Sequence, residues 1–104
     1  MRMTHPTALV LTALASGCRY GFDVMDVTGL PSGTVYPVLR RLDNQGYVRS
    51  EWEESEEAKE RGRPRRRLYR LTGEGRRAVV AAEERLSEAR QLIFRPRANE
   101  GGGS

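Results

Sequence analysis

The stretch Leu30–Gly46, LPSGTVYPVLRRLDNQG, decides the fold of this 104-residue chain. Its apolar residues recur at four- and three-residue spacing, which predicts a helix with one buried face over residues 31–45. Pro37 lies well inside this segment, where a proline removes a backbone donor and crowds the preceding turn. Because the apolar spacing continues across Pro37, we predict one kinked helix rather than two. The residues that set the spacing are Val35, Leu39 and Leu42.

Two shorter helices are predicted before this segment. Thr4 or His5 can cap the first one, Pro6 suits its first turn, and Gly17 is a natural stop. A second helix is predicted over residues 20–28. Its apolar members are Phe22, Val24, Met25 and Val27.

After Gly46 the hydrophobic period changes to two, which predicts a strand through Val48, Ser50 and Trp52 with one covered face. This alternation places Trp52 in the core of the wing, which we favour over a ligand-binding role. The polar stretch 53–65 is predicted to be a loop, and a return strand is predicted over residues 66–71. The two strands therefore form a hairpin.

A final helix is predicted from the cap Thr72 to about Phe94. A helix of about 20 residues is about 30 Å long and would overhang a domain of this size. We therefore favour dimerisation through its apolar seam over packing within one chain. The seam residues, spaced 3-4-3-4, are Val79, Ala82, Leu86, Ala89 and Ile93.

The predicted order is three helices, a hairpin and a helix, which is the plan of a winged helix-turn-helix in a mainly α (α+β) fold. We predict a DNA-binding domain over residues 1–72, a dimerisation helix over 73–94 and a disordered tail over 95–104. A single Cys excludes a disulfide scaffold, and no apolar run approaches a membrane span. A cytoplasmic protein that does not enter a membrane is expected.

The charge balance points to a polyanionic partner. The 18 basic residues include 17 Arg, and the sequence pI is about 9.8. With one His, one Cys and no phosphate-binding glycine loop, no enzyme, cofactor or metal is expected. His5 and Cys18 are too isolated for a metal site. A redox role for Cys18 would require a lowered thiol pKa.

Three stretches and Trp52 together resemble the PadR family of bacterial transcriptional regulators. The most specific run, Gly-Thr-Val-Tyr-Pro, explains Pro37, because that family carries a proline at this place in its recognition helix. The stretches are Tyr20–Val24 (YGFDV), Leu30–Gly46, and Gly62–Gly75 (GRPRRRLYRLTGEG).

The resemblance implies a homodimeric repressor that binds a palindromic, double-stranded operator and is released by a small-molecule effector, a stress signal or a partner protein. Only one helix follows the hairpin, so the chain resembles the short subgroup. The last helix of one subunit is expected to contact the first and last helices of the other, which adds Leu9 to the seam.

DNA contacts are expected from the start of the third helix, which a helix-turn-helix places in the major groove, and from the Arg-rich hairpin. The expected helix residues are Ser32, Gly33, Thr34, Tyr36, Pro37, Arg40 and Arg41. The expected hairpin residues are Arg61, Arg63 and Arg65.

One feature departs from a simple DNA-binding hairpin. Residues 51–60 carry a net charge of −5, and residues 61–70 carry six Arg. We predict that the two arms pair across the hairpin. The alternative function is a winged-helix module that docks a partner protein rather than DNA.

Overall fold

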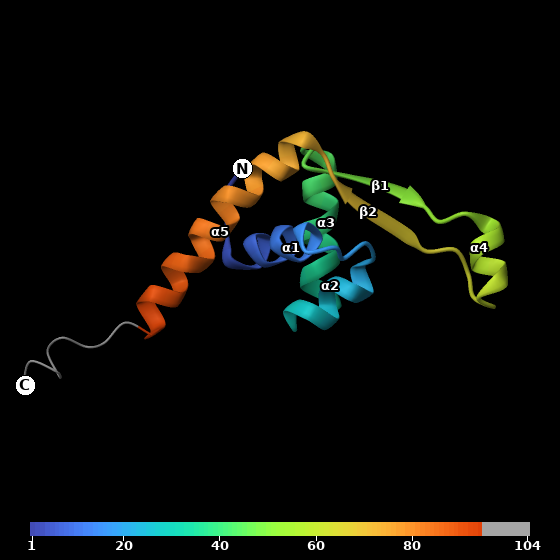
Figure 1. The fold of residues 1–104 in the computed structure, drawn as a ribbon, viewed down its shortest axis with the longest axis horizontal. Helices are drawn as coiled ribbons and strands as arrows, with labels where there is room; N and C mark the ends of the chain where they lie inside the picture. Colours follow the sequence, from blue (N-terminus) through green and yellow to red (C-terminus); the bar gives the residue numbers. More distant parts are fainter. Residues whose placement is uncertain (95–104) are drawn as a thin grey trace, which may run out of the picture.

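The computed structural model describes residues 1–94 of the chain and contains five helices and one hairpin within them (Figure 1). The order confirms a mainly helical winged helix fold with a long C-terminal helix. The elements are α1 (His5–Ala15), α2 (Gly21–Thr28), α3 (Ser32–Asn44), β1 (Val48–Trp52), α4 (Ser55–Glu60), β2 (Arg67–Leu71) and α5 (Gly73–Phe94).

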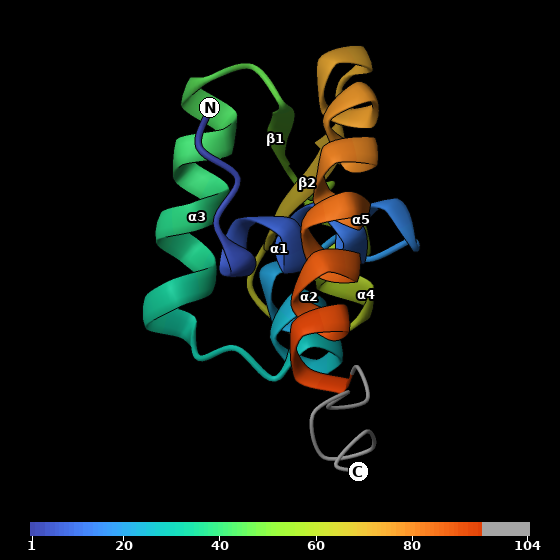
Figure 2. The same cartoon turned by 90° about the vertical axis from the view of Figure 1, so that its left-hand side faces the viewer.

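The core forms where α1 packs against α2, α3 and α5. Figure 2 shows α1 between α3 and α5. Leu11, Leu39 and Leu42 are completely buried, and each contributes about 1.5–3 kcal/mol through removal of apolar surface from water. The Thr4 hydroxyl caps α1 by accepting from the Thr7 N–H at 3.3 Å.

The prediction of a single helix across Pro37 is confirmed. Val35, Val38 and Leu39 on both sides of the proline are buried on the same face, while Pro37 is exposed. The apolar face therefore continues through the position that lacks a donor, because packing outweighs the local cost of the proline.

Helix α2 buries less than its sequence suggests. Only Val24 of its predicted apolar members is completely buried, and Met25 packs partly against the core. Phe22 and Val27 are each 64% exposed. A helix of eight residues has room for only a narrow buried face.

The wing, which we define as residues 48–71, is an antiparallel hairpin with Val48 opposite Leu71 and Trp52 opposite Arg67. The prediction of a loop over residues 53–65 is wrong in part, because α4 occupies its centre. Glu, Ala and Lys are good helix formers, the acidic residues stand in its first turn, and Ala58 is buried. The return strand begins at Arg67, one residue later than predicted.

Two contacts fix the start of α5: a hydrogen-bonded cap at Thr72 and a close approach of Gly75 to the backbone of Tyr47. The Thr72 hydroxyl accepts from the Gly75 N–H at 3.0 Å, as expected for a cap, and donates to the Gly46 carbonyl at 2.6 Å. A Cβ at Gly75 would lie 1.9 Å from the Tyr47 carbonyl oxygen. Only glycine therefore fits at this crossing.

The first half of α5 lies along α1. Ala82 is completely buried there, and Val79 and Leu86 pack partly against the core. Beyond this contact Leu92 and Ile93 are 72% and 71% exposed.

Within the described residues, no helix combines the length and apolar character needed to cross a membrane. The predicted tail over 95–104 lies outside the described residues.

Candidate nucleic-acid interface

The exposed face of α3 gathers five of the seven residues that the sequence singled out on this helix. Ser32, Tyr36 and Arg40 are spaced four residues apart, so their side chains lie along one side of the helix. Gly33 and Pro37 lie beside them, and all five are exposed. We call this set the α3 face. It presents hydroxyls, an aromatic ring and a guanidinium, which can contact phosphates and base edges.

Tyr36 is held in place by the first residue of α2. A Cβ at Gly21 would lie 2.4 Å from Tyr36 Cε1 and 2.7 Å from its hydroxyl oxygen, closer than real Cβ atoms approach. The ring therefore rests directly on the backbone of Gly21 while remaining 41% exposed. This contact explains the glycine in the YGFDV stretch.

Thr34 and Arg41 lie away from the α3 face. They are seven residues apart and so share another side of the helix, and Thr34 is half-buried. The Arg41 guanidinium lies 3.5 Å from the Thr7 hydroxyl of α1. The structure therefore does not bring these two predicted residues together with Tyr36 and Arg40.

A hollow of about 300 Å³, which we call the wing groove, joins α3 to the wing. Across it, the Ser50 hydroxyl donates to Asp43 at 2.9 Å and accepts from the Arg67 guanidinium at 2.9 Å. This chain of hydrogen bonds ties both strands to α3 and places Arg67 in the same groove as Arg40. The groove is lined by Tyr36, Arg40, Asp43, Ser50, Arg67 and Tyr69.

The prediction that Trp52 lies in the core is wrong, since its side chain is 55% exposed. The hairpin extends away from α1 and α3 toward α4 (Figure 1), and the core residues of the sheet, Val48 and Tyr69, lie at its other end. The Trp52 ring centroid is instead 5.8 Å from the Arg65 guanidinium carbon and 5.1 Å from that of Arg67. Both distances are within cation–π range, so the indole holds two guanidinium groups on one face of the wing.

Sequence reasoning missed Arg67, although a signal for it was present. Arg67 begins the return strand and lies opposite Trp52, and Arg65 precedes it by two residues, the spacing that repeats a side-chain direction in an extended chain. The pairing of an Arg-x-Arg with a tryptophan on the facing strand indicates a stacked, exposed arginine pair.

Glu53 joins the wing to the start of α2. The Glu53 side chain is only 1% exposed and accepts a hydrogen bond from the Tyr20 hydroxyl at 3.1 Å. Its carboxylate also forms a bidentate ion pair with the Arg63 guanidinium, in which Nη2 lies 2.7 Å from Oε2. The Arg63 hydrogen bonds are the main reason that the pKa of the Glu53 carboxyl falls to about 2. Sequence reasoning counted Glu53 as one acid in a polar run and missed its burial.

The pairing of the acidic and basic arms is confirmed. Glu53 forms an ion pair with Arg63, and Glu51 forms one with Arg70 at 3.2 Å across the hairpin. Arg61 lies 3.7 Å from Glu57, one turn earlier at the end of α4. Arg63 and Arg61 are therefore partly neutralised by the chain itself.

Arg65 and Arg67 form no ion pair within residues 1–94, so they keep their charge available. A hydrogen bond fixes the orientation of the Arg65 side chain, since its Nε donates to the Glu53 carbonyl at 2.8 Å. Of the three hairpin arginines that the sequence singled out, Arg65 is the one oriented with an unpaired guanidinium.

The residues expected to form a dimer seam divide into two groups. Ala82 is fully enclosed by its own chain and has no surface left for a partner. Leu9, Val79, Leu86 and Ala89 are half-buried, and Ile93 is exposed. Packing within the chain therefore accounts for the first part of the seam, and the end of α5 stays uncovered.

No metal site appears in the part of the chain that the structure describes, since no three potential ligands gather there. Burial raises the pKa of the Cys18 thiol, and the nearby Asp23 raises it further. A raised pKa disfavours the thiolate that a redox sensor needs, so the structure does not support that role.

In sequence and structure, the chain is similar to bacterial regulators. No curated protein matches the sequence. PcaV, a transcriptional regulator from Streptomyces coelicolor solved with its natural ligand, is 27% identical with a TM-score of 0.71. The match covers 95% of this chain and 66% of PcaV, so the chain spans just under two thirds of that relative.

Two structures of PadR-type proteins are similar over more of their own length. The PadR-like transcription factor of Bacteroides fragilis is 26% identical with a TM-score of 0.63, and the match covers 84% of each chain. A PadR family regulator of Clostridium difficile has a TM-score of 0.69 over 86% of this chain and 95% of its own, and at 19% identity it supports the fold alone.

A family model described as the transcriptional regulator PadR-like family matches residues 10–81. This span runs from α1 into α5 and includes the α3 face, the wing groove and the whole wing. The chain therefore belongs to the PadR-like family of transcriptional regulators, which bind DNA and are not enzymes.

Proposed function

We propose that this protein is a homodimeric repressor that places the α3 face in the major groove of a palindromic operator and the wing along the flanking backbone. The observation that carries the proposal is the wing groove, which brings Arg40 of α3 and Arg67 of β2 to one surface. A helix face and a hairpin that share one basic surface fit a duplex in which groove and backbone lie side by side.

On α3, Tyr36 and Arg40 are the specificity residues in this proposal. Arg can donate two hydrogen bonds to guanine, and a tyrosine ring can contact a thymine methyl or a phosphate. Gly33 leaves open space above the backbone, since nothing lies within 4 Å of a Cβ built there. That space permits close approach of the duplex to the start of the helix. Ser32 and Pro37 complete the contact face.

On the wing, Arg65 and Arg67 are the backbone-contacting residues. They carry unpaired guanidinium groups in fixed positions on Trp52, which lowers the entropy that they lose on binding. Arg63 acts indirectly, because its guanidinium is committed to Glu53. Arg61 is secondary, since it lies beside Glu57.

Dimerisation is proposed through the uncovered end of α5, where Leu92 and Ile93 are exposed, together with Leu9 of α1. Two-fold symmetry of such a dimer would present two α3 faces, and a palindromic site mirrors that symmetry. Residues 1–72 then act as the DNA-binding domain and residues 73–94 as the dimerisation helix.

Selection of bound DNA from a random pool tests the proposal as a whole. We expect enrichment of a palindrome, with an affinity that falls steeply as salt rises. Recovery of unrelated sequences, or of single half-sites only, would contradict it. A reporter gene driven through the selected site should be silenced when the protein is expressed, and increased expression would contradict the repressor role.

Matched variants locate the contact surface. Tyr36→Ala or Arg40→Ala should abolish binding to the selected site in a mobility-shift assay while the circular dichroism spectrum stays unchanged. Arg49→Ala is the control, because it removes the same charge from the hairpin position opposite Arg70, on the face that does not line the wing groove. Equal effects of Arg40→Ala and Arg49→Ala would refute a specific role for the α3 face.

A further inference from the structure

Glu53 is the only charged residue that is buried within residues 1–94, and none of the proposed DNA contacts uses it. Burial of a carboxylate costs free energy unless ion pairs and hydrogen bonds compensate for the lost water. The bidentate pair with Arg63 supplies that compensation and fixes the carboxylate in one orientation. A carboxylate held in this way can orient the other groups that donate to it.

The side chain of Glu53 fixes the residue that caps the start of α2. Its Oε2 accepts from the Tyr20 hydroxyl at 3.1 Å. The Arg66 guanidinium carbon lies 3.9 Å from the centroid of the same ring, within cation–π range. The Tyr20 carbonyl accepts from the Val24 N–H at 3.1 Å, which begins the helix. Tyr20 is therefore held by its hydroxyl, its ring and its backbone.

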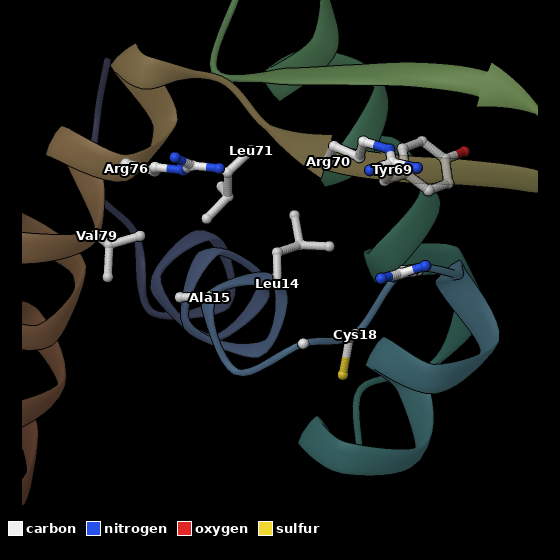
Figure 3. Close-up of a pocket in the computed structure, with 10 residues that line it drawn as sticks. Leu14, Ala15, Cys18, Tyr69, Arg70, Leu71, Arg76 and Val79 are labelled. Carbon is white, nitrogen blue, oxygen red and sulfur yellow. The ribbon is translucent and has the colours of Figure 1, made fainter.

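The backbone of the loop between α1 and α2 is attached to the wing as well. The Tyr69 N–H of β2 donates to the Arg19 carbonyl at 2.7 Å, one residue before Tyr20. Figure 3 shows the hollow beside this loop, with Cys18 on the loop and Tyr69 on the strand. One link through the backbone and another through Glu53 therefore tie the start of α2 to the wing.

The contact continues from α2 to the α3 face. Gly21 follows Tyr20 directly, and the Tyr36 ring rests on the Gly21 backbone, where a Cβ would lie 2.4 Å from Tyr36 Cε1. A change in the position of Tyr20 therefore displaces the surface that supports the Tyr36 ring.

The backbone of Glu53 supports the other half of the DNA-binding surface. Its carbonyl accepts from Arg65 Nε at 2.8 Å, and its N–H donates to the Arg66 carbonyl at 2.8 Å. The residue that supports Tyr36 through its side chain thus orients a wing arginine through its main chain.

We propose that Glu53 is a positioning residue for operator recognition. Its side chain fixes Tyr36 through Tyr20 and Gly21, and its carbonyl fixes Arg65. Groups that contact a ligand hold their geometry only when hydrogen bonds behind them lock their side chains. The α3 face and the wing therefore meet the duplex in one fixed relation. The inference rests on the proposed function, because it assumes that Tyr36 and Arg65 contact DNA.

Removal of one hydroxyl tests the link to α3. Tyr20→Phe deletes the donor to Glu53 but keeps the ring against which Arg66 lies. At a temperature where circular dichroism shows a folded protein, we expect its affinity for the selected operator to fall by about 3- to 30-fold in mobility shifts. The loss on unrelated DNA of the same length should be smaller, because Tyr36 is a specificity residue.

Tyr47→Phe is the matched control for this variant. It removes the same hydroxyl from a residue that packs against the core and does not line the wing groove. We expect it to bind the operator like the wild-type protein. Unchanged affinity of Tyr20→Phe, or an equal loss in Tyr47→Phe, would overturn the inference.

The sign of the effect of Glu53→Gln separates positioning from charge. This substitution removes a negative charge and releases Arg63, so a purely electrostatic role predicts tighter DNA binding. Positioning predicts binding that is weaker by about 3-fold or more. Glu51→Gln is the control, since it removes the same charge from an exposed pair with Arg70 and should not weaken binding. Tighter binding by Glu53→Gln would overturn the inference, and Tyr20→Phe alone decides if Glu53→Gln does not fold.

A double-mutant cycle tests the route through Gly21. Gly21→Ala displaces the Tyr36 ring directly, so the added loss from Tyr20→Phe should be smaller in that background than in the wild-type protein. Fully additive losses would refute the route to Tyr36.

A measurement without DNA separates the inference from the proposed function. Tyr20→Phe should shift the Tyr36 ring-proton resonances in nuclear magnetic resonance spectra of the free protein, and Tyr47→Phe should not. Unshifted resonances in Tyr20→Phe would overturn the positioning of Tyr36 whether or not the protein binds DNA. Failure of the wild-type protein to bind any DNA, with the resonances shifted, would refute only the proposed function.

Discussion

Gly75→Ala should destabilise the protein severely. An alanine Cβ at this position would lie 1.9 Å from the Tyr47 carbonyl oxygen and 3.0 Å from Leu71 Cδ2. Ordinary van der Waals contact begins at about 3.4 Å, so α5 would have to move by about 1.5 Å relative to the chain that enters β1. The obstacle is a backbone carbonyl, which no side-chain rotation can relieve.

The cost of this movement can be estimated from the contacts that it disturbs. The same Tyr47 carbonyl accepts from the Thr72 N–H at 3.1 Å, and a lost hydrogen bond costs about 1 kcal/mol. Overpacking adds about 1–3 kcal/mol, and the better helix propensity of alanine offsets up to about 1 kcal/mol. The net loss is about 1–4 kcal/mol, and at about 4–8 °C per kcal/mol for a domain of this size the melting temperature falls by about 4–30 °C.

Thermal unfolding followed by far-ultraviolet circular dichroism measures the effect. Gly73→Ala is the matched control, because it makes the same substitution two residues earlier in α5 and its Cβ would meet nothing nearer than the Arg77 guanidinium at 3.9 Å. We expect Gly73→Ala to melt at or above the wild-type temperature. Indistinguishable melting of the two variants would refute the reasoning from close approach.

Four further predictions concern the wing, α3 and α5. Gly21→Ala should displace the Tyr36 ring and weaken operator binding in mobility shifts with little change in melting temperature, because the clash falls on the end of a side chain that can rotate; normal affinity would contradict this. The pKa of Glu53 is lowered to about 2, so its stabilisation is complete above its ordinary value of 4.5 and is lost as the pH falls toward 2. Glu53→Gln should therefore flatten the acid side of the stability profile, and an unchanged profile would show that another group is responsible. Arg63→Ala should lower the melting temperature as well as DNA affinity, since it leaves Glu53 buried without its partner, whereas a simple phosphate contact would leave the melting temperature unchanged. Ile93→Asp should shift the dimer toward monomer in sedimentation without unfolding the protomer, because Ile93 is exposed within one chain; an intact dimer would remove Ile93 from the interface.

The sequence was most informative along α3, where the apolar spacing matches the buried face. Leu39 and Leu42 continue the apolar face of α3 beyond Pro37, so one helix was predictable despite the proline. Thr72 was identifiable as a cap because capping is a local interaction between neighbouring residues. These features depend on positions within one element and need no knowledge of how elements meet.

The features that could not be predicted from the sequence all depend on contacts between elements. Trp52 shares the face of β1 that carries Val48, but whether a position on that face is covered depends on how far the hairpin extends from the helices. Glu53 is hydrophilic by type and buried only because Tyr20 and Arg63 surround it. The closeness of Gly75 to the Tyr47 carbonyl likewise follows from the crossing of two segments, which no periodicity reveals.

The position of Trp52 determines what intrinsic fluorescence can report about this protein. It is the single tryptophan, it is 55% exposed, and two guanidinium groups lie against its ring. Its emission should therefore respond when a phosphate binds the Arg65 and Arg67 guanidinium groups beside the indole, so unlabelled operator can be titrated directly. The same exposure makes the indole a poor reporter of the core, and emission can stay nearly constant while the helices unfold.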